Sequence, residues 1–166
     1  MGHFDVVELL LTHGSLVDVA DENGEQPLHL ASQLGHTEVM KLLIKFGATV
    51  DAASKVGYTP LHLAAETGQA DAVKLLLESG ATVNAAGENG ATPMHWAAYH
   101  DKVEVAAILM RHGASLKAKD SSGRSPVELA IEQAKENGQD GTDVLELLKG
   151  LARHQHDGPR QPRDEL

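Results

Sequence analysis

The sequence repeats itself every 33 residues, and this period restricts the chain to very few architectures. One series of prolines keeps the step: Pro27, Pro60, Pro93 and Pro126. Two series of glycines keep it as well: Gly24, Gly57, Gly90 and Gly123, then Gly14, Gly47, Gly80 and Gly113. A single unit of this size cannot bury its own apolar face, so such units stack on their neighbours as a solenoid.

Each unit predicts two short helices and a protruding turn. Thr59 followed by Pro60 is a helix start, since proline suits the first helical position. The apolar residues of 61–65 form the first helix, which Gly68 ends, and residues 72–77 show helical apolar spacing up to Gly80. Residues 81–91 are polar and rich in glycine, which indicates a turn or hairpin. The fold class predicted is therefore all-α.

Composition agrees with thin layers of small helices. Hydrophobic residues make up 42% of the chain, but aromatic residues only 3%. The core must then consist of Leu, Val, Ile and Ala. On this reasoning Trp96, which replaces Leu30 and Leu63 at one repeat position, is interpreted as core filling.

The repeat resembles the ankyrin repeat, whose TPLHxA signature stands here at residues 59–64. The second half of the family pattern is found at residues 35–48. The resemblance runs from Gly2 to about Leu151 and implies an ankyrin-repeat domain at 1–151, followed by a disordered tail at 152–166. The units are a half repeat at 1–20 and full repeats at 21–53, 54–86, 87–119 and 120–151.

The two ends depart from the repeat. Residues 2–14 match residues 35–47, so the first unit lacks its first helix. We expect a longer array cut at Met1, and the alternative is an end covered by a partner or a second copy. In the last unit Glu128 replaces the signature histidine, and a six-residue expansion at 136–141 separates its helices. Polar residues on the final helix predict a solvent-facing cap.

Charge and residue content exclude several functions. The net charge is −10 and no stripe of Lys or Arg opposes it, so nucleic-acid binding is not expected. Cysteine is absent, and no apolar run approaches the roughly 20 residues of a membrane helix. No G-x-S-x-G, P-loop or G-x-G-x-x-G motif occurs. We expect no enzyme activity, no cofactor and a monomer.

The histidines do not predict a metal site. His29, His62 and His95 occur once per repeat, so they lie about 10 Å apart in a stack of helices. A single ion needs all its ligands within roughly 2.1 Å. The ankyrin resemblance implies instead that these histidines hydrogen-bond between neighbouring loops.

Positions that vary between the units predict the binding surface. In the ankyrin family the turn tips and the ends of the first helices form a concave face. There Leu34, Val56, Tyr58 and Tyr99 are apolar or aromatic, where solvent-facing residues are otherwise polar. The remaining candidates on this face are charged or polar: Lys55, Glu66, Glu88, His100 and Arg124. The prediction is a protein-binding scaffold, adaptor or inhibitor. The alternative is a targeting segment of a larger enzyme, channel or effector.

Two short motifs concern modification and location. Asn84 occupies the position that an asparaginyl hydroxylase modifies in some ankyrin repeats, although Thr82 stands where an acidic residue is usual. The final residues Arg163-Asp164-Glu165-Leu166 resemble an ER-retention tetrapeptide. No signal peptide accompanies it, so coincidence is the preferred explanation. We expect a cytoplasmic or nuclear protein.

Overall fold

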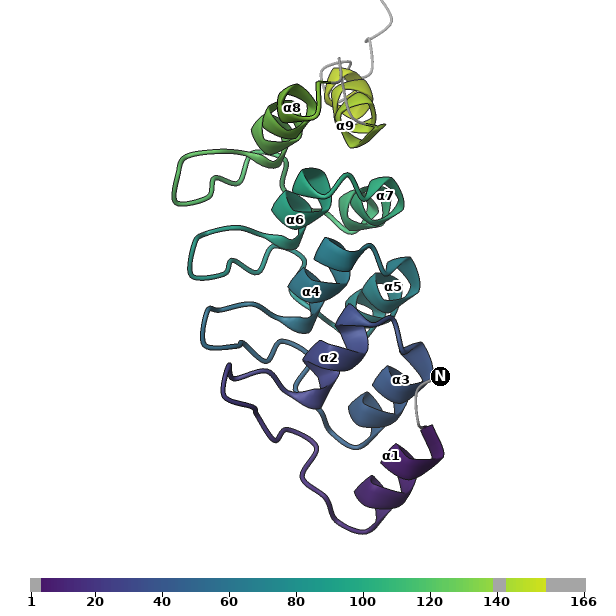
Figure 1. Cartoon of the computed structure of the whole chain (residues 1–166). Helices are drawn as coiled ribbons and strands as arrows, with labels where there is room; N and C mark the ends of the chain where they lie inside the picture. The colour runs from purple at the N-terminus through teal and green to yellow at the C-terminus, as the bar shows by residue number, and fades with distance from the viewer. Residues whose placement is uncertain (1–3, 139–142, 155–166) are drawn as a thin grey trace, which may run out of the picture.

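The computed structural model describes residues 4–138 and 143–154, which contain nine helices and no strand (Figure 1). The all-α fold class predicted from the sequence is therefore confirmed. The helices are α1 (Phe4–Thr12), α2 (Pro27–Gln33), α3 (Thr37–Lys45), α4 (Pro60–Thr67), α5 (Ala70–Glu78), α6 (Pro93–Tyr99), α7 (Val103–Arg111), α8 (Pro126–Glu136) and α9 (Asp143–His154).

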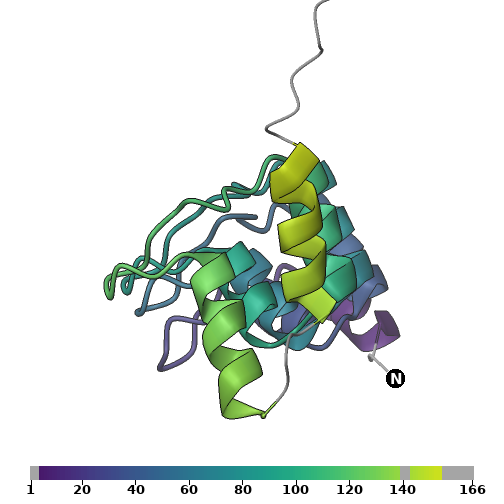
Figure 2. The same ribbon diagram turned by 90° about the horizontal axis from the view of Figure 1, so that it is seen from above.

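The helices form two parallel columns. The inner helices α2, α4, α6 and α8 pack along one another, and each also packs against the outer helix that follows it. Loops project from the same side of every repeat, which is clearest when the stack is viewed from above (Figure 2). The side bounded by the inner helices and the loops is the concave face. The half repeat contributes a single outer helix, α1, which packs on α3.

Local chemistry sets the helix bounds. Proline occupies the first position of all four inner helices, and the residue before it is extended, as at Thr59 with φ −95° and ψ 165°. Helix α4 ends at Gly68, whose φ of 80° is a left-handed conformation that favours glycine. These start and stop signals are the reason that the predicted helices lie where the structure has them.

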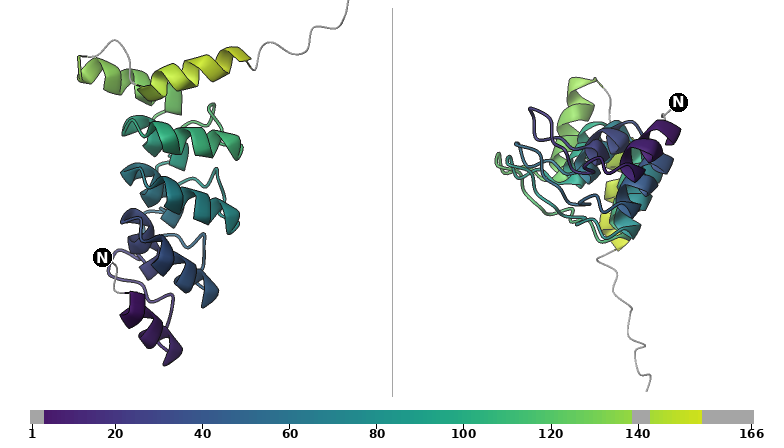
Figure 3. Two further views of the ribbon diagram at one scale, coloured as in Figure 1. Left: turned by 90° about the vertical axis from the view of Figure 1, so that its right-hand side faces the viewer. Right: turned by 90° about the horizontal axis from the view of Figure 1, so that it is seen from below.

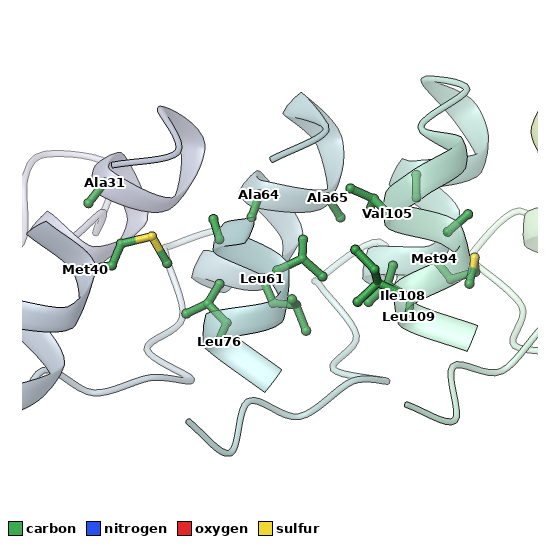
Figure 4. Close-up of a cluster of buried hydrophobic side chains, with 14 of the residues drawn as sticks. Ala31, Met40, Leu61, Ala64, Ala65, Leu76, Met94, Val105, Ile108 and Leu109 are labelled. Atoms are coloured by element: carbon green, nitrogen blue, oxygen red, sulfur yellow. The ribbon is translucent and has the colours of Figure 1, made fainter. Parts of the chain in front are cut away.

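The core is built from small aliphatic residues in matching layers (Figure 4). Leu28, Leu61 and Met94 hold the same repeat position and are fully buried. The alanines three residues further along, such as Ala64, are buried as well and allow the inner helices to approach closely. Because every layer repeats, burial between repeats rather than within one repeat stabilises the molecule.

Backbone hydrogen bonds join each loop to the next. The N–H groups of Lys55, Glu88 and Ser121 donate to carbonyls of the preceding loop at 2.8, 3.0 and 2.8 Å. A Cβ atom at Gly57 would lie 2.8 Å from the backbone nitrogen of Glu88, so only glycine permits this approach. The loops therefore form one continuous, backbone-bonded edge.

The signature histidines add a second link between the repeats. In each case Nδ1 accepts the N–H of the residue before the proline, and Nε2 donates to a carbonyl of the next loop. For His29, His62 and His95 the acceptors are the carbonyls of Tyr58, Ala91 and Arg124, at 3.0, 3.1 and 3.1 Å. The bond between loops that the resemblance implied is confirmed.

The last helix pair closes the stack (Figure 3). Helix α8 has 11 residues and uses part of the expansion for a longer helix, while residues 139–142 are outside the described part of the chain. Glu128 accepts hydrogen bonds from Lys119, the last residue of the preceding repeat, and from Ser125 of its own repeat, and these bonds lower the pKa of its carboxyl group to about 2. Helix α9 buries Val144 and Leu148 and exposes Asp143 and Glu146, as a polar cap requires. The helix continues to His154, and the rest of the predicted tail lies outside the described residues.

Asp101 fastens this cap to the body of the stack. It holds the position of Gly35 and Gly68 and keeps their left-handed backbone, with a φ of 52°. Its Oδ1 accepts the N–H of Val144 at 2.9 Å, in the first turn of α9. Asp101 therefore adopts a backbone conformation that is strained for a residue with a side chain, and in this position its carboxylate caps α9.

Replacing Asp101 separates these two effects. Asp101→Ala loses the cap and keeps the strain, so we expect the free energy of unfolding to fall by about 1–2 kcal/mol. Asp101→Gly loses the cap but relieves the strain, so its stability should lie closer to that of the wild type. Urea unfolding followed by circular dichroism measures both, and equal losses in the two variants would contradict the strain argument.

Candidate protein-binding surface

Four aromatic rings meet on the concave face and form what is called here the aromatic cluster: Tyr58, Trp96, Tyr99 and His100. The Trp96 ring is 5.3 Å from Tyr58 edge-on and 5.8 Å from His100 in a stacked arrangement. Tyr99 contacts both Trp96 and His100, at 6.5 and 5.0 Å between centroids. Helix α6 supplies Trp96 and Tyr99, and His100 follows directly at its end, whereas Tyr58 comes from the loop before α4.

Trp96 is the residue that sequence reasoning missed. Its assignment to the core is wrong, because the side chain is only half-buried and lines a hollow on the concave face. Leu63, at the same repeat position, is buried, but Leu30 is largely exposed. The burial of this position therefore differs from repeat to repeat. The chain's single tryptophan at a varying repeat position was the available signal.

Tyr58 is held in place on several sides. Its ring stacks on His62 at 5.5 Å, and its hydroxyl accepts a hydrogen bond from Asn89 at 3.3 Å. A Cβ atom on Gly87 would lie 2.7 Å from the ring, so the tyrosine rests directly on that backbone. Burial raises the pKa of the Tyr58 phenol, partly opposed by the Asn89 bond. Tyr58 therefore contributes to the packing between the loops, in addition to any contact with a partner.

A hollow of about 300 Å³ lies beside the cluster. Trp96 and Tyr99 line it from α6, Leu129 from α8, and Arg124 from the last loop. Arg124 is fixed there by Asp120, which accepts from Nε and Nη2 at 3.0 and 2.9 Å. Burial alone would raise the pKa of Asp120, but the hydrogen bonds from Arg124 outweigh it, and the pKa is lowered. The hollow therefore has aromatic and apolar walls with an anchored ion pair at its edge.

The other predicted residues surround the cluster unevenly. Glu66 lies beside it, with Oε1 3.8 Å from Nε2 of His100. Val56, Lys55 and Glu88 are exposed on the loop edge, where the Val56 carbonyl accepts the N–H of Glu88. Leu34 is exposed at the end of α2, one repeat before Thr67, and lies outside the ring contacts. The structure thus brings together predicted residues of three successive repeats, since Arg124 lines the hollow beside Tyr99, and leaves Leu34 apart.

Asn84 links two turns through its side chain. Its Nδ2 donates to the carbonyl of Gly113 at 3.2 Å, and its Oδ1 accepts the N–H of Ser115 at 2.8 Å. One repeat earlier Asp51 likewise accepts the N–H of Thr82, and two repeats earlier Asp18 accepts the N–H of Thr49. The residue itself is exposed. Hydroxylation of Asn84 remains a prediction.

The described residues provide neither a metal site nor a membrane-spanning helix. Residues 4–138 and 143–154 contain no group of three His, Asp or Glu side chains placed to hold one ion. Both ring nitrogens of each signature histidine are engaged in hydrogen bonds. No helix in the same ranges has the length and apolar character needed to cross a bilayer. The terminal tetrapeptide 163–166 lies outside the described residues.

Comparison with protein families identifies the repeat. A family model for ankyrin repeats (3 copies) matches residues 1–87, and one for ankyrin repeats (many copies) matches residues 80–130. The chain belongs to the ankyrin-repeat family. Members of this family are generally protein–protein interaction modules and typically have no enzyme activity. A search of curated proteins gave no match.

Proposed function

We propose that the chain binds a partner protein on its concave face, with the aromatic cluster as the centre of contact. The observation that carries this proposal is the partly exposed cluster next to a 300 Å³ hollow. Aromatic side chains are the commonest energetic anchors of protein interfaces, and an anchor needs a recess that excludes water. The hydrogen-bonded loops and stacked helices hold this surface rigid, which keeps the entropy loss on binding small.

The expected contact surface includes the residues predicted from the sequence, with Trp96 added. Tyr99 and Trp96 form its apolar centre, and a partner side chain occupies the hollow between α6 and α8. Charged residues at the edge select the partner rather than supply most of the affinity. The complete candidate set is Leu34, Lys55, Val56, Tyr58, Glu66, Glu88, Trp96, Tyr99, His100 and Arg124. In this role the chain acts as a scaffold, adaptor or inhibitor in the cytoplasm or nucleus, without catalysis or a cofactor.

A double substitution, Trp96→Ala with Tyr99→Ala, tests this surface. If the two rings are anchors, the dissociation constant should rise about 30-fold, which corresponds to roughly 2 kcal/mol. Affinity capture from the source cell, read by mass spectrometry, would first identify the partner, and calorimetry would then measure its affinity. Circular dichroism must show that the variant is folded.

The matched control is Arg111→Ala on the outer helix α7, which should bind as the wild type does. A partner that binds the folded double variant with unchanged affinity would contradict the proposal and place the contact elsewhere on the molecule. Tyr58→Ala belongs in a separate experiment, because the loss of its contacts with His62 and Gly87 should also lower the stability of the fold.

A further inference from the structure

Carboxylates outnumber cations around the aromatic cluster and its hollow. Asp120 lines the hollow, and Oε2 of Glu132 lies 3.3 Å from Nη1 of Arg124 at its edge. Glu66 adds a third carboxylate beside the cluster itself. The basic residues among the described residues that line the hollow are Arg124 and His95, and burial lowers the pKa of His95, which keeps that ring neutral. One positive charge therefore stands against three negative charges.

The existing cation is not free to receive an anion. Asp120 accepts hydrogen bonds from Nε and Nη2 of Arg124, and Glu132 accepts one from Nη1. The hydrogen bond to Asp120 and the nearby carboxylates raise the pKa of the guanidinium. Lys119, which precedes Asp120 in the chain, is paired with Glu128 in the same manner. An anionic guest would have to displace these carboxylates, whereas a cationic guest would find lone pairs of Glu132 still open, since a carboxylate offers about four.

Trp96 and Tyr99 supply a second attraction for a cation. Both rings line the hollow, and they stand nearly perpendicular, at 82°, with their centroids 6.5 Å apart. The face of an aromatic ring carries partial negative charge and attracts a cation that lies within about 6 Å of its centroid. Arginine makes this contact more often than lysine, because its planar guanidinium stacks on the ring while its N–H groups donate to a carboxylate. The hollow offers both kinds of group side by side.

We propose that this hollow receives an arginine side chain from a basic segment of the partner protein. The inference rests on the proposed function, because it names the chemistry of the partner that the concave face binds. The guanidinium stacks on Trp96 or Tyr99 and donates to Glu132, while Leu129 contacts the methylene groups of the same side chain.

The size of the hollow and the charge of the whole chain agree with this guest. A volume of about 300 Å³ is at the lower end of the range for ligand sites and suits one long side chain rather than a larger group. The net charge of −10 attracts a basic segment from a distance and repels an acidic one. The affinity for the partner should therefore fall when the salt concentration is raised.

The single tryptophan of the chain, Trp96, reports on the hollow directly. Its fluorescence is followed while the full chain is titrated with the peptide acetyl-Gly-Arg-Gly-amide. Two control peptides carry citrulline, which has nearly the shape of arginine but no charge, or glutamate in place of the arginine. One side chain binds weakly, so half-saturation with the arginine peptide is expected at about 1 mM, and the citrulline peptide should need at least about 10-fold more. The glutamate peptide should give no saturable change.

Charge substitutions in the protein show where the arginine peptide binds. Glu132→Gln keeps the shape of the side chain without its charge, so this peptide should bind at least about 3-fold more weakly. Arg124→Gln removes a like charge and should make it bind about 3-fold more tightly. The matched control is Glu104→Gln, which removes a carboxylate paired with Lys74 on the outer helices and should change nothing. Circular dichroism checks that each variant is folded.

The proposal fails if the arginine peptide gives no saturable change, or if it binds no more tightly than the citrulline peptide. It fails as well if Glu132→Gln and Glu104→Gln behave alike, or if the glutamate peptide is preferred and Arg124→Gln abolishes its binding. The double substitution Trp96→Ala with Tyr99→Ala is measured with the captured partner rather than with these peptides. A partner that depends on the two rings, beside a hollow that ignores charge, would overturn this inference alone and leave the proposed function in place.

Discussion

Replacing Leu76 by alanine is expected to lower the free energy of unfolding by about 2–5 kcal/mol. Leu76 lies in α5 at the centre of the stack and is fully buried. Its removal loses the transfer energy of the deleted methyl and methylene groups and leaves a cavity, because neighbouring repeats restrict relaxation. Since stability depends on contacts between repeats, a loss in a central layer weakens the interfaces on both sides of it.

The repeat supplies a matched control for this prediction. Leu10 occupies the same position as Leu76 in its unit but is half exposed, so Leu10→Ala should cost about 1 kcal/mol or less. Urea unfolding followed by circular dichroism compares the two variants, and an unchanged slope in each shows that the comparison is valid. Equal losses would mean that position within the repeat, rather than burial, determines stability.

The sequence predicted the elements of the fold because their signals are local. Residues 61–65 and 72–77 were predicted to be helical, and the structure has α4 at Pro60–Thr67 and α5 at Ala70–Glu78. Proline starts and glycine stops act within one or two residues, so one unit is sufficient to place them. Repetition of these signals in phase then determined the architecture.

The details of the candidate site depended on contacts that a repeat alignment does not contain. Comparison of the repeats assigned Trp96 to the core by analogy with Leu63, although the indole is only half-buried and lines the hollow. The ring of Tyr58 packs on the backbone of Gly87 in the next repeat, and Asp101 caps α9 of the last repeat. Each of these contacts involves a residue that differs from its equivalents in the other repeats. Whether such a residue makes a contact depends on where its side chain points, which the sequence does not show. The binding role of the candidate residues stays a prediction.

Acid should destabilise the protein through His62, which is buried at the junction of two repeats. Its Nδ1 accepts the N–H of Thr59 at 3.1 Å and its Nε2 donates to the Ala91 carbonyl at 3.1 Å, so the ring is neutral. Protonation would place a hydrogen on Nδ1, against the Thr59 N–H. Burial lowers the pKa of His62 to about 4 from its usual 6.5, and the bond to Ala91 opposes this shift only partly.

The direction of the pH dependence follows from these two pKa values. Above pH 6.5 the imidazole is neutral in both the folded and the unfolded chain, so it contributes no dependence. Between pH 6.5 and about 4 the unfolded chain binds a proton that the folded chain does not. The free energy of unfolding therefore falls with falling pH across this window, by roughly 3 kcal/mol in total. Below pH 4 the contribution of His62 is constant.

Urea unfolding at pH 7 and pH 4.5 measures the contribution of this ring. The wild type and His112→Gln, a substitution at an exposed histidine, should lose the same amount of stability between the two pH values. His62→Gln cannot be protonated, so it should lose about 2 kcal/mol less, even though it is less stable at pH 7. Some dependence should remain in that variant, because burial lowers the pKa of His95 too. If His62→Gln loses as much stability as the wild type, the acid sensitivity originates elsewhere, and the histidine links between loops do not limit stability at low pH.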